Sequence, residues 1–280
     1  MTKEEKAGAA AFLDLAGDYL SGGFRRERGK YAFKDDREGD PREYAVSRGS
    51  GPGNNRFTGD EETAPDGRVE NGDSLEAVAA EVSRCKRCGL CTTRTNTVPG
   101  EGVSRPLVMV IGEGPGADED SSGRPFVGRA GQLLDRMLDS RGKIGLSRGN
   151  NCHIANIVKC RPPGNRNPQP DETAACVPFL VRQIKLLRPK IILAAGNTAA
   201  KTLLDSSQGI TRLRGTWTRF QGTFLMDGSF DIPLIPTFHP SALLRDESLK
   251  APVWEDLKLL REKLCELDGD YAARMAETPL

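Results

Sequence analysis

Residues 107–131 read LVMVIGEGPGADEDSSGRPFVGRAG, and this stretch decides the fold. The run at 107–111 is apolar, rich in β-branched side chains and followed by breakers, which predicts a buried strand. The glycine loop at 112–116 lets the backbone approach a ligand closely, with amides free to donate. A helix is predicted to begin near Val127. Ligands bind open α/β sheets beyond the carboxyl ends of strands, so this loop is the first candidate for a binding site.

An ordinary strand-to-helix turn is the alternative interpretation of the glycine loop. Two familiar phosphate-binding loops are excluded. The glycine spacing does not match GxGxxG, and acidic residues at 118–120 stand where a pyrophosphate would bind. The GK[ST] ending of a Walker A loop is also missing from the sequence.

Charge is unevenly divided along the 280-residue chain. Residues 1–73 hold 12 Lys and Arg against 16 Asp and Glu, whereas the remainder holds 28 against 23. A mildly basic body is compatible with a polyanionic partner but does not require one. No apolar run approaches the roughly 18 residues of a membrane span, and the start MTKEEKAGAA lacks a secretory signal. We therefore expect a cytoplasmic, intracellular protein with no membrane contact.

The N-terminal part differs in character from the rest. Residues 3–21 show helical spacing with one apolar face, and two glycines end the helix. This helix either docks on an unidentified protein partner or packs on its own domain. From 24 to 73 the chain is charged, rich in Gly and Pro and without periodicity, which predicts a disordered linker. We expect residues 1–73 to be an extension and 74–280 to be the globular domain.

Strands and helices are predicted to alternate through the globular domain. The predicted strands cover 107–111, 152–158, 191–195 and 232–237. The predicted helices cover 74–84, 128–141, 171–187, 198–205 and 253–267. This alternation predicts an α/β fold, with a parallel sheet covered by helices on both faces.

The seven cysteines of this apparently intracellular chain are more typical of metal ligands or free thiols than of disulfides. Cys152 and Cys265 lie in predicted elements and are expected to be buried apolar residues. Cys91 extends a CxxC pair to CxxCxxC and competes as a ligand. Four thiols from two distant segments could hold either zinc or a [4Fe–4S] cluster, and their spacing does not decide between these: Cys85, Cys88, Cys160 and Cys176.

Five motifs stand together in order: CxxC, GEGPGxxED followed by GRPFVG, NIVKCRPPGNRNP, a later Cys, and FHPSALLR. This set resembles the family 4, iron–sulfur uracil-DNA glycosylases over residues 75 to about 267. The resemblance implies a three-layer α/β/α sandwich around a four-stranded parallel sheet. It also implies a [4Fe–4S] cluster on the same four cysteines, with Cys91 an addition to the usual pattern. The implied reaction is hydrolysis of the N-glycosidic bond of deoxyuridine in base excision repair, leaving uracil and an abasic site.

The resemblance assigns the base pocket to a small set of residues. Asn156 matches the base-reading position, where an amide can pair with both uracil O4 and N3–H. Phe126 matches the aromatic that stacks on the base, and Gly114 of the glycine loop is a further residue expected to bind the substrate. From the residues alone, a strand-end Asn that caps the next turn is the preferred interpretation of Asn156, and a core position is an equally good interpretation of Phe126.

Catalytic roles follow from the same resemblance. His239 of the HPS motif would donate to uracil O2, where negative charge develops. Glu113 would position water and stabilise the sugar cation, with Glu119 in support, although loop acids facing solvent are the alternative. No lysine nucleophile is required, so a monofunctional enzyme without strand nicking is expected.

The segment after His239 is expected to run along DNA. Ser241 would hold a phosphate, Arg245 would pair with another, and Leu243 or Leu244 would wedge into the vacated stack. The expected partner is uracil-containing DNA, single- or double-stranded, bound by a monomer. The rival hypotheses are an inactive iron–sulfur module that binds DNA or a polymerase, and a zinc-stapled α/β hydrolase.

Overall fold

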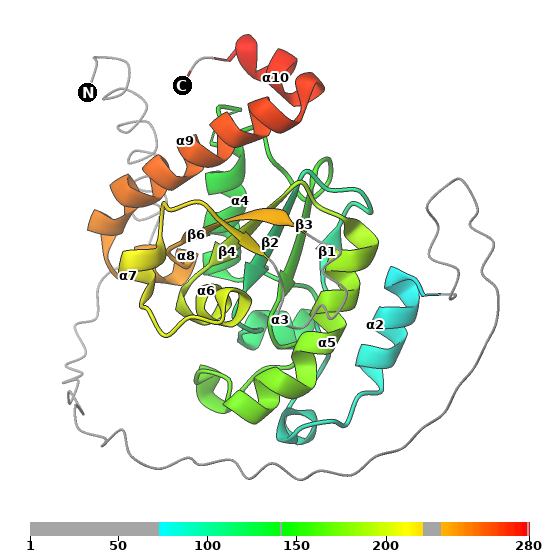
Figure 1. The fold of residues 1–280 in the computed structure, drawn as a ribbon. Helices are drawn as coiled ribbons and strands as arrows, with labels where there is room; N and C mark the ends of the chain where they lie inside the picture. Colours follow the sequence, from blue (N-terminus) through cyan, green and yellow to red (C-terminus); the bar gives the residue numbers. More distant parts are fainter. Residues whose placement is uncertain (1–72, 141, 221–230, 279) are drawn as a thin grey trace, which may run out of the picture.

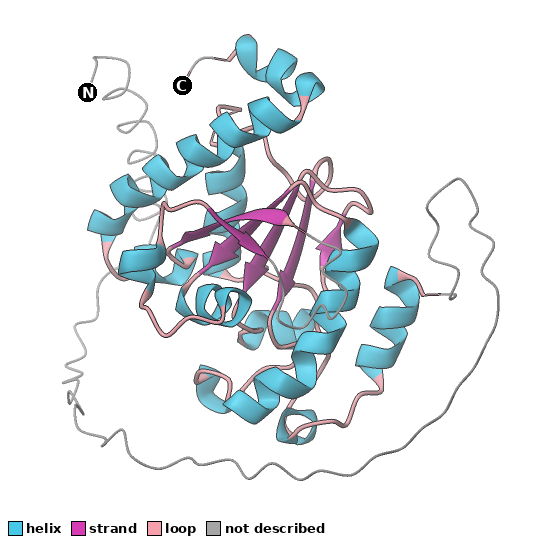
Figure 2. Cartoon of the chain, viewed as in Figure 1, coloured by secondary structure: helices cyan, strands magenta, loops and turns pink. Residues whose placement is uncertain are grey.

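The computed structural model describes residues 73–140, 142–220, 231–278 and 280. The predicted helix at 3–21 and the predicted linker, apart from its last residue, lie outside them. The described chain forms an α/β fold, with a central sheet between two layers of helices (Figures 1 and 2). The predicted fold class is confirmed.

The sheet has six strands in the order β1-β3-β2-β4-β6-β5. The central strands β3, β2, β4 and β6 are parallel, whereas β1 and β5 pair antiparallel at the two edges. The prediction of a four-stranded parallel sheet was therefore incomplete, because the sheet is mixed and wider. The strands are β1 (Glu101–Gly102), β2 (Val108–Gly112), β3 (Cys152–Asn156), β4 (Ile191–Ala195), β5 (Thr218–Phe220) and β6 (Ile232–Thr237).

Side chains alternate between the two faces of the sheet. In β2, Val108 and Val110 face one core cluster, whereas Met109 and Ile111 face the other. This alternation follows from the two-residue period of a strand, and it explains why strands buried on both faces are continuously apolar.

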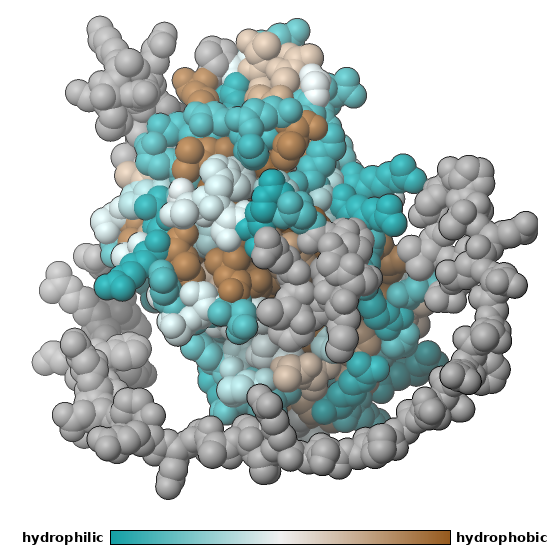
Figure 3. Space-filling model, in the orientation of Figure 1, coloured by the Kyte–Doolittle hydropathy of each residue, from teal (hydrophilic) through white to brown (hydrophobic). Residues whose placement is uncertain are grey.

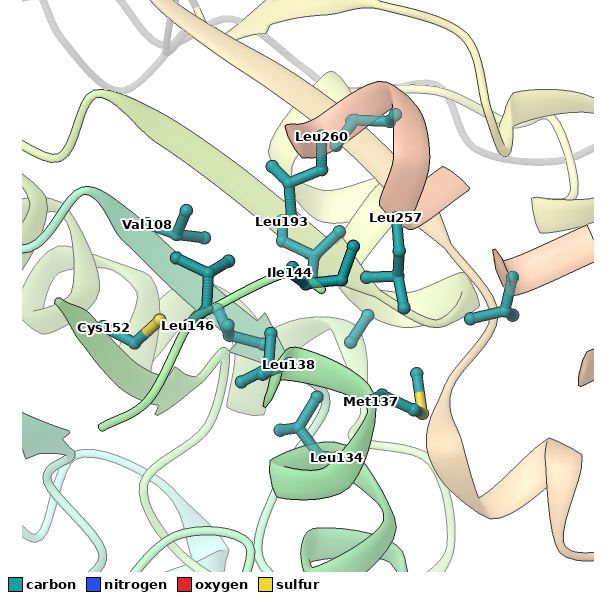
Figure 4. Packing of buried hydrophobic residues seen from close by; sticks show 14 of the residues in the cluster. Val108, Leu134, Met137, Leu138, Ile144, Leu146, Cys152, Leu193, Leu257 and Leu260 are labelled. Atoms are coloured by element: carbon teal, nitrogen blue, oxygen red, sulfur yellow. The ribbon is translucent and has the colours of Figure 1, made fainter. Parts of the chain in front are cut away.

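The first face is covered by α4 (Arg129–Asp139), α8 (Pro240–Leu243), α9 (Lys250–Leu267) and α10 (Gly269–Ala276). Figure 4 shows Leu134 and Leu138 of α4 gathered in one cluster with Leu257 and Leu260 of α9. Cys152 lies in the same cluster with no exposed surface, which confirms its predicted role as a buried apolar residue.

The second face is covered by α2 (Leu75–Ser83), α5 (Pro170–Leu187) and α6 (Asn197–Leu204). Ser74 caps α2, since its hydroxyl accepts a hydrogen bond from the Ala77 amide at 3.1 Å. α5 continues through Pro178 without a break. Short helices fill the connections: η1 (Gly89–Thr92), α3 (Ala117–Ser122), η2 (Pro163–Asn165), α7 (Ile210–Leu213) and η3 (Glu247–Leu249).

The visible surface is mainly hydrophilic, with smaller apolar patches between charged residues (Figure 3). Among the described residues, Leu267 is the one large apolar side chain classed as exposed, at 39%. Within the same residues, every helix is too short or too polar to cross a bilayer.

Candidate active site at the carboxyl ends of the parallel strands

A cavity of about 560 Å³ opens where the parallel strands end. The glycine loop, the Pro-rich loop after β3 and the turns after β4 and β6 form its walls. This is the crevice in which open α/β sheets bind ligands. The cavity brings together eight of the residues predicted from the sequence: Glu113, Gly114, Glu119, Phe126, Asn156, His239, Ser241 and Arg245.

Asn156 is the last residue of β3 and is only 1% exposed. Its Oδ1 atom is buried and has no hydrogen-bond partner within the described part of the chain. A buried acceptor without a partner costs about 1–3 kcal/mol. Such an atom at the wall of a cavity is suited to a ligand that donates a hydrogen bond.

Gly112, the last residue of β2, makes room for the two side chains predicted to bind the base. A Cβ atom there would lie 2.5 Å from Phe126 Cζ and 2.6 Å from Asn156 Oδ1. Only a residue without a side chain allows the ring and the amide to meet over the sheet.

Phe126 is held in an unusual backbone conformation, with φ at +52°. Positive φ is uncommon for a bulky residue and persists where the surroundings hold it. Arg148 supplies that support, donating to the carbonyls of Pro125 at 2.9 Å and Phe126 at 3.0 Å. As a result the Phe126 ring stands beside the His239 ring, with 5.5 Å between centroids.

His239 follows β6 and caps α8. Its Nδ1 atom accepts the Ser241 backbone N–H at 3.1 Å, and the Ser241 hydroxyl oxygen lies 2.8 Å away. Burial, with a smaller effect from Arg245, lowers the pKa of His239 to about 4. The ring is therefore neutral near pH 7 and carries its proton on Nε2, because Nδ1 must offer a lone pair to the amide.

Glu113 contributes one carboxylate to the cavity. Its Oε2 atom accepts a hydrogen bond from the hydroxyl of Thr198, in the first turn of α6. The sequence reasoning missed Thr198. The available signal was its position just after β4, the same strand-end position that marks the other residues of the site.

Glu119 accepts hydrogen bonds from backbone amides around the cavity. Its Oε1 accepts the amides of Val127 at 2.8 Å and Gly128 at 2.9 Å, and its Oε2 accepts the Gly116 amide at 3.0 Å. Both oxygens are thus committed to loop amides. Glu119 fixes the glycine loop to the start of α4 and so shapes the cavity.

The two leucines of the FHPSALLR segment differ in exposure. Leu243 is 1% exposed and lies in the core cluster under α4 and α9. The prediction that it could wedge into DNA is wrong, because the one-turn helix α8 directs it into the protein. Leu244 is partly buried against the same cluster, whereas Arg245 is exposed at the cavity.

A second, smaller cavity lies between α2, η1 and α5, and five cysteines line it: Cys85, Cys88, Cys91, Cys160 and Cys176. Two of the sulfurs accept hydrogen bonds: Arg94 Nη1 donates to Cys160 at 3.1 Å, and the Lys159 amide donates to Cys176 at 3.2 Å. Burial raises the pKa of the Cys176 thiol to about 11. Donors of this kind offset the charge of a thiolate ligand. Cys265 lies elsewhere, partly buried against the first core cluster.

Comparison with known proteins decides the family. A model described as the uracil DNA glycosylase superfamily matches residues 99–258, which is more than half of the chain. The chain belongs to the uracil-DNA glycosylase superfamily. The matched residues include the whole lining of the larger cavity. Together with the Type-4 relatives described next, this match confirms the resemblance drawn from the five motifs.

Three relatives of this glycosylase carry the name Type-4 uracil-DNA glycosylase. The protein from Thermotoga maritima is 43% identical over 187 residues, covering 66% of this chain and 91% of the relative. The protein from Sulfurisphaera tokodaii is 42% identical over 197 residues, covering 68% and 84%. The protein from Saccharolobus solfataricus is 40% identical over 199 residues, covering 69% and 87%.

Proposed function

We propose that this chain is a monofunctional uracil-DNA glycosylase that hydrolyses the N-glycosidic bond of deoxyuridine in DNA, releasing uracil and leaving an abasic site. One observation carries the proposal. The buried, unpaired Oδ1 of Asn156 faces a cavity that also holds the Phe126 ring and a neutral His239. A hydrogen-bond acceptor, an aromatic face and a donor in one cavity are what a flipped uracil requires.

Asn156 reads the base in this proposal. Its Oδ1 accepts from uracil N3–H, and its amide nitrogen donates to O4. Cytosine presents the opposite pattern at these two positions, which would leave the buried amide mismatched at about 1–3 kcal/mol per group. Phe126 stacks on the flipped base, and base–aromatic stacking contributes about 1–3 kcal/mol.

His239 stabilises the leaving group. The Nε2–H of its neutral ring donates a hydrogen bond to uracil O2. Negative charge develops on that oxygen as the glycosidic bond breaks. Because the Ser241 amide fixes the ring beforehand, little reorganisation is needed during the reaction, and preorganised donors are usually the largest catalytic contribution.

Glu113 supports the sugar cation and positions the attacking water, held in place by Thr198. Glu119 acts as a positioning residue, since its oxygens are bound to three backbone amides. A bond that breaks through an oxocarbenium-like sugar needs little help from a base. Both acids are therefore expected to contribute less than His239.

DNA binding is assigned to the rim of the cavity. Arg245 would pair with a phosphate next to the flipped nucleotide, a positioning contact without sequence content. A phosphate contact by Ser241 and a wedge role for Leu244 stay predictions. We assign the glycosylase domain to residues 74–280 and expect it to act as a monomer on single- or double-stranded DNA.

The cysteine-lined cavity fits an iron–sulfur cluster. Five thiols line this one cavity, and two of the sulfurs accept hydrogen bonds of the kind that offset the charge of a thiolate. The resemblance to the iron–sulfur glycosylases favours a [4Fe–4S] cluster over zinc, and the cluster would be bound by Cys85, Cys88, Cys160 and Cys176. When bound, it crosslinks the segment before β1 to the Pro-rich loop and α5.

The experiment that tests the function is cleavage of a uracil-containing single strand, with alkali to reveal abasic sites. Wild type should release uracil, and Asn156→Asp should lose uracil activity and gain cytosine activity. Asn150→Asp, an exposed change of the same chemistry, should match wild type. A wild-type protein that binds the strand but leaves uracil in place would instead be an inactive DNA-binding module.

A further inference from the structure

The segment Asn156–Cys160 joins the base pocket to the cysteine-lined cavity within five residues. Asn156 lines the first cavity, whereas Lys159 and Cys160 line the second. Between them the backbone is fixed to the glycine loop: Ile157 N–H donates to the Gly112 carbonyl at 2.9 Å, and Val158 N–H donates to the Glu113 carbonyl at 3.1 Å. The two sites therefore share one rigid stretch of chain.

Lys159 bonds to both ends of this stretch. Its backbone N–H donates to Cys176 Sγ at 3.2 Å. Its side chain folds back toward the pocket, and Nζ donates to the Asn156 carbonyl oxygen at 2.9 Å. One residue thus contacts a cysteine of the second cavity and the backbone of the residue proposed to read the base.

The ammonium group is anchored on its other side by Gln183 of α5. Lys159 Nζ donates to Gln183 Oε1 at 2.6 Å, and Gln183 Nε2 donates to the Pro99 carbonyl at 2.8 Å. Lys159 and Gln183 are 1% and 3% exposed, respectively. A lysine is almost never fully buried unless it is paired. The proposed catalytic steps give it no role, so its burial needs another explanation.

We infer that Lys159 is a positioning residue that holds Asn156 in its base-reading orientation and ties that orientation to the cysteine-lined cavity. The inference rests on the proposed function. The carbonyl that Lys159 binds belongs to the same residue as the unpaired Oδ1 atom, so a rotation of this peptide would move the amide away from the base. A positioning error of about 1 Å at a reacting site can lower rates by about 10²-fold.

The test separates base recognition from general DNA binding. Affinities are measured for two oligonucleotides, one with the uncleavable 2′-fluoro-deoxyuridine and one with a tetrahydrofuran abasic analogue. Lys159→Met should weaken binding to the first by about tenfold or more, as expected for a misplaced hydrogen-bond pair, and leave binding to the second within about twofold. Iron content and thermal midpoint are measured on the same samples.

Three variants complete the test. Gln183→Leu removes the hydrogen-bond acceptor of Lys159 Nζ and leaves the segment next to Cys160 unchanged. It should also weaken binding to the deoxyuridine analogue selectively, but by less than Lys159→Met. Lys159→Arg should recover part of the lost selectivity. Lys250→Met is the matched control, because Lys250 is also buried, at 3% exposure, and its Nζ lies 3.2 Å from Glu247. It should leave the ratio of the two affinities unchanged.

The outcomes are distinct. Equal loss for both oligonucleotides in the Lys159→Met and Gln183→Leu proteins, or no loss for either, would overturn the positioning role. Loss of iron with an unchanged ratio of affinities would overturn it as well, because Lys159 would then serve only the cysteine cavity. Failure of the proposed function looks different: the wild-type protein itself would not prefer the deoxyuridine analogue over the abasic one.

Discussion

Replacing Gly112 with alanine should disable the base pocket while leaving the fold in place. The added Cβ would lie 2.5 Å from Phe126 Cζ and 2.6 Å from Asn156 Oδ1, whereas ordinary contacts begin near 3.4 Å. Each side chain must therefore move by about 1 Å. Misplacement of that size lowers rates by about 10²-fold, and a lost hydrogen bond to uracil adds about 1–3 kcal/mol. Taken together, the two effects should lower single-turnover uracil excision by about 10³- to 10⁴-fold.

The matched control is Gly149→Ala, because a Cβ at Gly149 meets nothing within 4 Å. It should excise uracil at the wild-type rate. Crowding at Gly112 should lower the free energy of unfolding by about 1–3 kcal/mol, so urea unfolding of both variants is measured beside activity. A folded Gly112→Ala protein that excises uracil within threefold of wild type would refute the assignment of Phe126 and Asn156 to the base.

Three further predictions address other parts of the molecule. Leu243→Ala should lower the free energy of unfolding by about 2–5 kcal/mol and Leu244→Ala by less, as measured in urea; equal effects would contradict the buried placement of Leu243. Burial lowers the pKa of His153 to about 4 from 6.5, so the unfolded chain binds the extra proton first as pH falls. His153 should account for a drop of up to about 3 kcal/mol between pH 6.5 and 4, in addition to the drop due to His239, whose pKa is lowered in the same way. His153→Gln should therefore reduce, but not abolish, the slope of that part of the urea-unfolding profile against pH. Arg94→Met removes the donor to Cys160 Sγ and should speed the loss of iron from the proposed cluster to a chelator, followed by absorbance; an unchanged rate would show that this bond does not protect the proposed cluster.

The central strands could be predicted because their signal is local. The run at 191–195 is five apolar residues between breakers, and β4 is Ile191–Ala195. The edge strands carry no such signal. β1 has two residues and β5 has three, too few for a two-residue period to show, and each becomes a strand only because its neighbour offers unpaired backbone groups.

The site was predictable at strand ends and less so elsewhere. Asn156 and Phe126 occupy the pocket that the motif order implied. Leu243 was misassigned because the sequence ALLR offers two adjacent leucines, and which one a single helical turn buries depends on the packing of α4 and α9. Thr198 was missed because a threonine after a strand has no chemistry of its own until Glu113 is beside it.

The pocket residues share an arrangement that no motif describes. Each group proposed to contact the base is fixed by a neighbour that does not. Arg148 holds the backbone of Phe126, and Ser241 fixes the ring of His239. Enzymes gain most from groups that are already oriented when charge develops. Replacing Arg148, which is placed against neither uracil nor DNA, should therefore lower the rate of excision, because the Phe126 ring would lose the support of its backbone.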